Sequence, residues 1–320
     1  MTIPERQAGD TFLLFSEFAY DSETDLPVGA GPGVCLDRTP HDVLKEVEPP
    51  ALADYVLPGY NLNAGFPNSC LRYSSSAIPP GNVQPSSLLF NSVVALRMVA
   101  PRAIRVEGQF RLGQDSNLIE NPSLYHLTSP WNPPVLGDHS ARDVRYAAGI
   151  ARRLVQLLDP AYGRIASSLV LFSQVTSGQV RSFQMAYLGL FAALEALFAP
   201  KGKKAEILGA RTGSFLSSVG TPGGWSVQEW LAKEYQMRRS QLAHGIQDIV
   251  PWGGTLEPRK RRAFGRLHEI ARLCILGFMS LPDGELQSIG EASGTKLQNR
   301  LKGLSPASGK YLKDQRMWCD

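Results

Sequence analysis

Glu234-Tyr-Gln-Met-Arg-Arg-Ser-Gln-Leu-Ala-His-Gly245 is the stretch that identifies the helical half of this chain. Gly245 follows a run of helix-forming residues, and glycine commonly stands just past the end of a helix. The pattern predicts a helix that begins near Ser226 and stops at Gly245, with Arg239 and His244 on its last turns. A guanidinium stabilises negative charge on a phosphate, and an imidazole carries a proton near neutral pH. Side by side at a helix end, the two groups are typical of metal-free cleavage of RNA.

The spacing of Arg239 and His244 bears on the assembly. Five residues correspond to about 140° round an α-helix, so one copy does not aim both groups tightly at one phosphate. Two copies packed about a symmetry axis could do so, which predicts a homodimer through the helical bundle. Ser240 stands one turn before His244 on the same face. The negative end of the helix dipole favours the protonated imidazole at His244.

Arginine and histidine recur at a similar spacing at Arg261, Arg262 and His268. His268 stands mid-helix between apolar neighbours, and no glycine follows it to end the helix. We therefore expect His268 to be a structural or surface group.

The chain after Pro134 has the texture of an antiparallel helical bundle. Ser140-Ala-Arg-Asp143 has the form of a capping box with aspartate in place of glutamate, which marks a helix start. Proline and glycine clusters then separate long apolar stretches at short intervals. The expected helices cover 140–158, 165–174, 180–199, 206–219, 226–243 and 259–281. Short loops between such helices favour antiparallel packing.

The first half is rich in proline and turns and is expected to be α+β. Strands are predicted over 11–18 and 103–112, and a helix over 86–99. The predicted domains are an α+β domain over 1–138 with a sensing or regulatory role, a bundle over 139–284, and a tail over 285–320 holding one helix.

Charge is divided unevenly along the chain. Residues 1–140 hold 8 Lys/Arg against 15 Asp/Glu, and the other 180 hold 25 against 14, although the net charge is only +4. The basic half suggests contact with a polyanion. Solvated, arginine-rich surface helices would explain the same numbers.

Several classes of protein are disfavoured. The polar start of the chain shows no secretory signal, and the apolar run over 183–199 is too short for a membrane span and is interrupted by Glu195. The four cysteines form no Cys-x-x-Cys pair, which favours reduced thiols in a cytoplasmic protein. No phosphate-binding glycine loop and no histidine spacing typical of a metal site occurs, so we expect no cofactor and no metal.

Three blocks together resemble a known family. They are Leu194-Glu195-Ala-Leu-Phe198, then Glu206 with Arg211, then Tyr235-x-x-x-Arg239-Ser-x-Leu-Ala-His244-Gly245. Their order and spacing over roughly residues 140–282 are similar to those of an Apea-like HEPN domain. The resemblance implies a dimerising helical bundle and, as in many members, a metal-independent endoribonuclease that attacks through the ribose 2′-hydroxyl.

The resemblance also implies roles for individual residues. His244 would transfer protons, Arg239 would stabilise the transition state, Ser240 would hold substrate or orient the imidazole, and Glu195 would fix the arginine or tune the histidine. Arg238, Lys201, Lys203 and Lys204 are candidate RNA-binding residues, and the doubled arginine leaves open which one serves the phosphate.

The wider role follows from the family alone. Its members often act in phage defence or as toxins, so candidate partners are RNA, including transfer RNA, and an antitoxin or phage-derived trigger. The alternative is a non-catalytic HEPN module that binds RNA or a partner protein. Open side chains at Arg239 and His244 would favour catalysis, whereas sealed ones would favour a scaffold.

Overall fold

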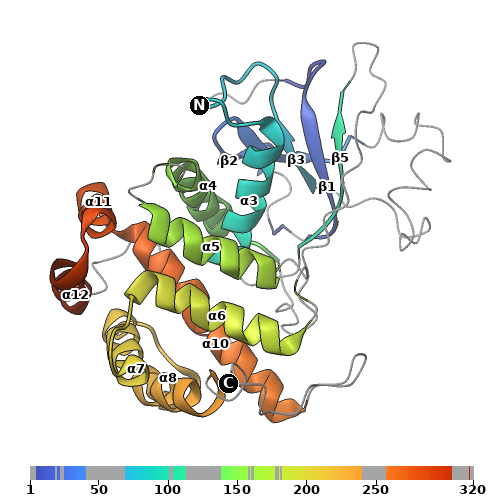
Figure 1. Ribbon diagram of the computed structural model, residues 1–320. Coiled ribbons are helices and arrows are strands. Elements are labelled where there is room, and N and C mark those ends of the chain that lie inside the picture. The colour runs from blue at the N-terminus through green and yellow to red at the C-terminus, as the bar shows by residue number, and fades with distance from the viewer. Residues whose placement is uncertain are drawn as a thin grey trace. The chain divides into compact units, whose positions relative to one another are not determined.

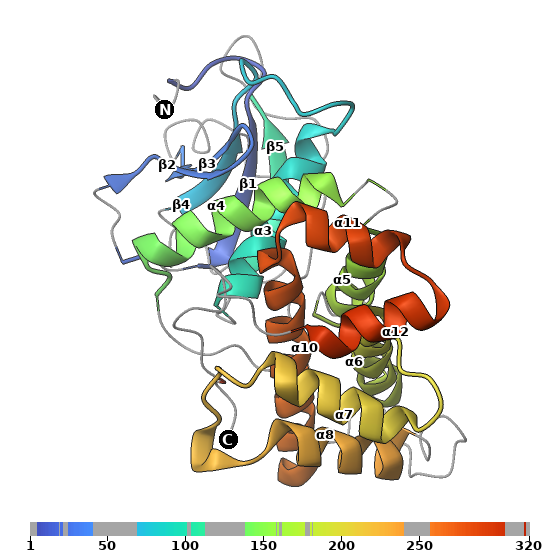
Figure 2. The ribbon, with the colours of Figure 1, turned by 90° about the vertical axis from the view of Figure 1, so that its left-hand side faces the viewer.

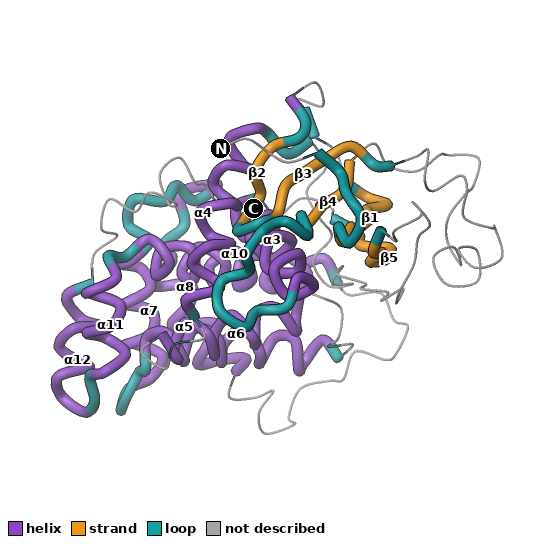
Figure 3. The backbone as a smooth tube through the Cα atoms, turned by 90° about the horizontal axis from the view of Figure 1, so that it is seen from above, coloured by secondary structure: helices purple, strands orange, loops and turns teal. Residues whose placement is uncertain are grey.

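The chain forms two compact units. The computed structural model describes residues 5–18, 20–21, 25–40, 69–100, 104–112, 138–157, 159, 162–176, 180, 182–239, 257–304 and 317. The sheet unit comprises residues 1–128 and 134–155, and the helical unit comprises 129–133 and 156–320. Strands occur only in the sheet unit among the described residues (Figure 3).

The sheet is antiparallel, with strand order β2-β3-β4-β1-β5 (Figure 1). Its strands are β1 (Thr11–Glu17), β2 (Val28–Gly31), β3 (Val34–Arg38), β4 (Ser69–Tyr73) and β5 (Arg105–Arg111). The two strands expected from the sequence are confirmed as β1 and β5, and the expected helix is confirmed as α3 (Pro85–Val99). The α+β character of this half is therefore confirmed.

Helices cover one face of this sheet. Gly31 is paired with Val34, and a Cβ placed on Gly31 would meet Ser92 of α3 and Ala151 of α4 (Ala141–Gln156) at 2.7 and 3.2 Å. Glycine is needed here because the two helices approach the strand so closely. Most of α4 thus belongs to the sheet unit, whereas the sequence placed it at the start of the bundle.

The start of α4 is capped as the sequence predicts. The backbone N–H of Asp143 donates to the Ser140 hydroxyl at 3.2 Å, and the backbone N–H of Ser140 donates to the Asp143 carboxylate at 2.9 Å. This reciprocal pair satisfies amide groups that a helix start leaves without partners.

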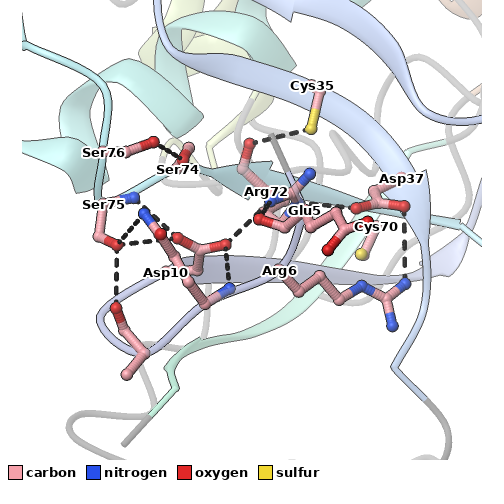
Figure 4. Close-up of polar contacts among 12 residues, drawn as sticks. Glu5, Arg6, Asp10, Cys35, Asp37, Cys70, Arg72, Ser74, Ser75 and Ser76 are labelled. Carbon is pink, nitrogen blue, oxygen red and sulfur yellow. Dashed lines mark hydrogen bonds and ion pairs between the residues drawn. The ribbon is translucent and has the colours of Figure 1, made fainter. Parts of the chain in front are cut away.

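The opposite face of the sheet holds a buried charge cluster (Figure 4). Arg72 donates through Nε to Asp37 at 2.7 Å and through Nη1 to Asp10 at 2.9 Å. Its Nη1 also donates to the backbone carbonyl of Glu5 at 3.3 Å. Asp10 in turn accepts from the backbone and hydroxyl of Ser75 at 2.8 and 3.0 Å. The segment before β1 is thereby bound to β3 and β4.

The helical unit is built from long helices around an aromatic core. Its helices are α5 (Gly163–Thr176), α6 (Phe183–Phe198), α7 (Lys204–Phe215), α8 (Val227–Glu234) and α10 (Pro258–Ser280). Phe198, Phe215 and Phe278 pack with ring centroids 5.1–5.7 Å apart, which joins α6, α7 and α10. No described helix combines the length and apolarity needed to cross a membrane.

The position of α8 depends on two glycines of α7. A Cβ on Gly209 would lie 2.6 Å from the carbonyl oxygen of Gln228, and one on Gly213 would lie 2.7 Å from the Gln228 Cβ. The pair stands four residues apart on one face of α7, so α8 can lie directly against it (Figure 2). This contact sets where the residues after α8 emerge.

Two short helices follow α10, where the sequence indicated one in the tail. They are α11 (Asp283–Glu291) and α12 (Gly294–Gly303). Arg211 of α7 links α12 to α6, because it donates to the Phe198 carbonyl and, at 2.8 Å, to the Gln298 side chain. Arg211 therefore connects α7 and α12 to the carboxyl end of α6.

His268 lies in the core of the helical unit, as expected for a structural group. Its ring packs on Phe172 at 4.9 Å, beside the buried pair of Glu269 and Arg272. Both Glu269 oxygens accept from Arg272, at 3.0 and 2.9 Å. Burial acts to raise the pKa of Glu269, but Arg272 and the hydrogen bond from His268 outweigh burial and lower this pKa to about 2.

We expect the helical unit to lose stability in acid through Glu269. A carboxyl whose pKa is about 2 when folded, against roughly 4.3 when unfolded, stabilises the fold above pH ~4.3 and loses that contribution as the pH falls toward 2. The expected loss between pH 6 and pH 3 is roughly 2 kcal/mol. Urea titrations followed by tryptophan fluorescence measure it, since Trp225 and Trp230 belong to this unit. In Glu269→Gln the free energy of unfolding should depend less on pH between pH 6 and pH 3. An equal pH dependence in both proteins would contradict the assignment.

Candidate functional site

The most promising site for chemistry joins α6 to the end of α8. Arg239 donates through Nε to Glu195 Oε1 at 3.2 Å, and the Tyr235 hydroxyl donates to the same oxygen at 3.0 Å. The guanidinium carbon of Arg239 also lies 5.6 Å from the centre of the Tyr235 ring. A carboxylate and an aromatic face thus hold one arginine from two sides. The structure thus brings two of the predicted site residues, Glu195 and Arg239, into direct contact.

Among the described residues, Arg239 is held through one of its three nitrogens, Nε. Neither Nη1 nor Nη2 forms a hydrogen bond within the part of the chain that the structure describes. The side chain is 35% exposed, against 21% for Glu195. Two parallel N–H groups on a fixed, open guanidinium match the oxygens of a phosphate.

A second cluster, deeper in the unit, holds the neighbouring arginine. Glu234 Oε1 accepts from the Tyr187 hydroxyl at 2.5 Å and forms an ion pair with Arg238 Nε. Arg238 is only 16% exposed. The two consecutive arginines therefore have different surroundings, and Arg239 is the more open.

The helix changes register where the two arginines stand. Tyr235–Arg239 is a π-helical turn that continues directly from α8, whereas the sequence predicted a regular α-helix through 243. Single π turns inside helices are rare and often mark functional sites. Here the turn carries Tyr235 and Arg239, both of which contact Glu195.

The two tyrosines stay protonated and act as donors. Burial, the hydrogen bond to Glu195 and the charge of Glu195 raise the pKa of Tyr235 to about 12. Burial and the neighbouring Glu234 raise the pKa of Tyr187 well above its usual value. Both phenols therefore remain neutral donors to carboxylates at physiological pH.

The predicted RNA-binding lysines differ in their surroundings. Lys204 Nζ lies 4.0 Å from Glu195 Oε2, which adds a positive charge to the site. Lys203 lies 3.5 Å from the exposed Glu206, and Lys201 is exposed in the loop between α6 and α7. Of the three lysines, Lys204 is the one that contacts Glu195.

Ser240 and His244 lie outside the described residues. Their predicted roles stay predictions, and the geometry of the site rests on Glu195, Tyr235, Arg239 and Lys204.

Sequence reasoning did not assign a role to Tyr187, Tyr235 or Glu234. Tyr235 stands four residues before Arg239, and Glu234 stands four before Arg238, a spacing that places such pairs together on a helix. That spacing could have revealed the two local pairs. Tyr187 carried no such signal, because its partner is 47 residues away.

The Arg72 cluster of the sheet unit is of another kind. Arg72 is 1% exposed, and both carboxylates bound to it accept further hydrogen bonds from nearby groups. A buried cluster whose carboxylate oxygens already accept hydrogen bonds stabilises the fold and has no exposed polar group for a ligand. The open guanidinium of Arg239 makes the helical cluster the better candidate.

Among the described residues, no three of His, Cys, Asp and Glu are grouped as metal ligands would be. Cys35, Cys70 and Cys274 are buried free thiols, and Cys319 lies outside the described part. Comparison of the chain with protein-family models, with curated proteins and with solved structures finds no significant match.

Proposed function

We propose that this protein is a metal-independent endoribonuclease whose site is centred on Arg239 in the helical unit. The observation that carries the proposal is the partly exposed guanidinium of Arg239, fixed through Nε by Glu195 with its Nη groups directed to no described partner. A positioned guanidinium in a partly enclosed site stabilises negative charge that develops on phosphate oxygens. The resemblance to Apea-like HEPN domains supports the same reading.

The proposed reaction is attack of the ribose 2′-hydroxyl on the adjacent phosphorus. The 2′-oxygen forms a bond to phosphorus as the 5′-oxygen leaves, and the products are a 2′,3′-cyclic phosphate and a 5′-hydroxyl. Arg239 would bind two phosphate oxygens and stabilise their added charge. His244 would take the 2′-hydroxyl proton or protonate the leaving oxygen. Ser240 would hold substrate or orient the imidazole.

Glu195 would act as a positioning residue for Arg239. It accepts from Tyr235 and Arg239 through one oxygen, which restricts the guanidinium to one orientation. Lys204 would supply longer-range attraction for the polyanion. Lys201, Lys203 and Arg238 would contribute to RNA contact more weakly.

The proposal includes a homodimer formed through the helical bundle. Met185 and Val170 are apolar side chains that are more than half exposed on α6 and α5, and Met237 is nearly so beside the two arginines. Burial of such side chains against a second copy would favour association. As in many proteins with this domain, we propose a role in phage defence or as a toxin.

Cleavage of RNA in the presence of EDTA tests the function. The purified protein should cleave transfer RNA or a structured RNA mixture without divalent metal and leave 2′,3′-cyclic phosphate ends. His244→Ala should lower the single-turnover rate by about 100-fold or more, because general acid–base catalysis contributes factors of this size. Product ends can be identified by mass spectrometry and by resistance of the 3′ ends to ligation.

Two outcomes separate the proposed function from its alternative. If His244→Ala cleaves as fast as the parent protein, the assignment is wrong. If neither protein cleaves RNA but both bind it, the domain is the non-catalytic module instead. Ser240→Ala, one turn away on the same predicted face, serves as the variant with a smaller expected loss.

A further inference from the structure

A stripe of arginines runs along the start of α10. Arg259, Arg262 and Arg266 are separated by three and four residues, so they lie within about 60° of one another around the helix axis. Arg259 and Arg262 are exposed, and Arg266 is partly exposed. None of the three forms an ion pair with any residue that the structure describes.

Two tryptophans lie beside this stripe. The guanidinium carbon of Arg266 stands 4.7 Å from the centre of the Trp225 ring, and the Trp225 and Trp230 rings are 5.7 Å apart in an edge-to-face arrangement. Both indoles are partly exposed. Trp225 Nε1 and Arg266 Nε are buried atoms, and neither has a hydrogen-bond partner among the described residues. The surface therefore offers cations and aromatic faces, and no described carboxylate forms an ion pair with its three arginines.

The positive charges of the stripe are unfavourable at the amino end of α10. The first turn of α10 contains no acid, although it carries Arg259, Lys260 and Arg261. Cations at the amino end of a helix oppose the helix dipole, which favours anions there. An anionic partner would reverse this effect, since its charge would be attracted both by the arginines and by the dipole.

We propose that Trp225, Trp230, Arg259, Arg262 and Arg266 form a docking surface for single-stranded RNA, here called the Arg–Trp surface. It is distinct from the Glu195–Arg239 cluster, because Trp225 precedes α8 and Arg239 ends the turn that follows it. The helical residues Val227–Arg239 number thirteen and span roughly 20 Å. A strand of a few nucleotides is long enough to cover such a span. The choice of RNA as the partner rests on the proposed function.

A single strand fits this surface better than a duplex. Indole faces stack on unpaired bases of any sequence, whereas paired bases are already stacked within their own helix. Arginine guanidinium groups bind phosphates and also stack on bases and aromatic rings. The combination of the two side-chain types is typical of sequence-tolerant binding to single strands.

The inference is tested by equilibrium binding to a 12-nucleotide 2′-O-methyl RNA labelled with a fluorophore. This probe has no free 2′-hydroxyl at its internal sugars, so it measures binding whether or not the protein is a nuclease. The test variant is Arg259→Gln/Arg262→Gln in the full chain. Its matched control is Lys296→Gln/Arg300→Gln, which removes two exposed charges from α12 of the same unit.

The test variant should bind about 25-fold more weakly at 0.1 M salt, and its log–log salt slope should be smaller by about 1.4, because each phosphate contact to a single strand contributes about 0.7. The control should bind as the parent does. The melting temperature of the test variant should not fall, because removal of these charges relieves the unfavourable contact with the helix dipole. Trp230→Leu tests the aromatic part and should lose affinity by about fivefold or more with an unchanged salt slope.

Unchanged affinity in both the arginine and the tryptophan variants would overturn the inference, as would an equal loss in the α12 control. Preference for a 12-base-pair duplex, or for anionic phosphatidylglycerol vesicles over the single strand, would overturn it as well. If the parent does not cleave RNA but the Arg–Trp variants lose binding as expected, the docking surface stands and the nuclease proposal alone fails.

Discussion

Replacement of Arg72 by methionine should lower the free energy of unfolding of the sheet unit by about 3–5 kcal/mol. Arg72 is 1% exposed and neutralises Asp10 and Asp37, which are themselves buried. Methionine would fill much of the same space, but it would leave the buried Asp10 carboxylate without its cation and Asp37 with only the longer contact to the partly exposed Arg6 among the described residues. Removal of one partner from a buried ionic cluster is costly for this reason, whatever the net contribution of the intact cluster.

Hydrogen exchange of amides in β1 and β4 measures this effect directly. No tryptophan falls in residues 1–128 or 134–155, so fluorescence would report on the other unit. Arg6→Met is the matched control, because Arg6 also contacts Asp37 but at 3.5 Å and with a 32% exposed side chain; its loss should stay below about 1 kcal/mol.

A variant that also neutralises both carboxylates distinguishes the effect of charge from the effect of side-chain shape at position 72. Arg72→Met combined with Asp10→Asn and Asp37→Asn removes all three charges and retains oxygens that can accept from Ser75 and the backbone of Arg38. We expect this variant to recover much of the stability lost by Arg72→Met, because no unpaired charge remains buried. If Arg72→Met alone costs less than 1 kcal/mol, the cluster does not hold the fold as described.

Replacement of Arg239 should lower the rate of cleavage, whereas replacement of Arg238 should lower stability. Arg239→Ala should lower the rate of RNA cleavage by about 100- to 1,000-fold, since loss of one group that stabilises transition-state charge has effects of this size. Arg239→Lys should not restore the rate, because an ammonium lacks the planar pair of donors. Single-turnover cleavage in EDTA measures both.

Arg238→Ala should instead act on stability. It would leave the buried Glu234 carboxylate with the Tyr187 hydroxyl as its one partner among the described residues, and we expect a loss of about 1–3 kcal/mol in the free energy of unfolding. Tryptophan fluorescence during urea unfolding measures it. A larger loss of cleavage in Arg238→Ala than in Arg239→Ala, with both proteins folded, would assign the phosphate to Arg238.

Parts of the fold follow from local patterns, and the sequence predicts those parts well. The Ser140–Asp143 capping box, the strands β1 and β5, and helices with apolar periodicity are all encoded within a few turns or a few residues. The second, third and fourth strands along the chain were not predicted. β2, β3 and β4 hold four or five residues each, too few for a clear alternation, and their hydrogen bonds go to distant segments.

In the candidate site, too, local sequence predicts some features and distant contacts decide the others. Local spacing identified Arg239 and the apolar helix that contains Glu195, and a resemblance over three blocks suggested that they act together. Spacing could not distinguish Arg238 from Arg239. Their different surroundings depend on Glu195, which lies 44 residues before Arg239 and contacts it directly. They depend also on Tyr187, which binds the Glu234 carboxylate that pairs with Arg238.

The sequence by itself determined the helical periodicity, the helix caps, the division of charge along the chain and the residue types available for chemistry. These properties depend on neighbours within one or two turns. The tertiary structure alone decided that Arg72 is sealed while Arg239 is partly open, and that Arg266 lies over Trp225. Burial and contact across 40 or more residues arise only when helices and strands pack, because the energy of a charged group depends on what surrounds it in space.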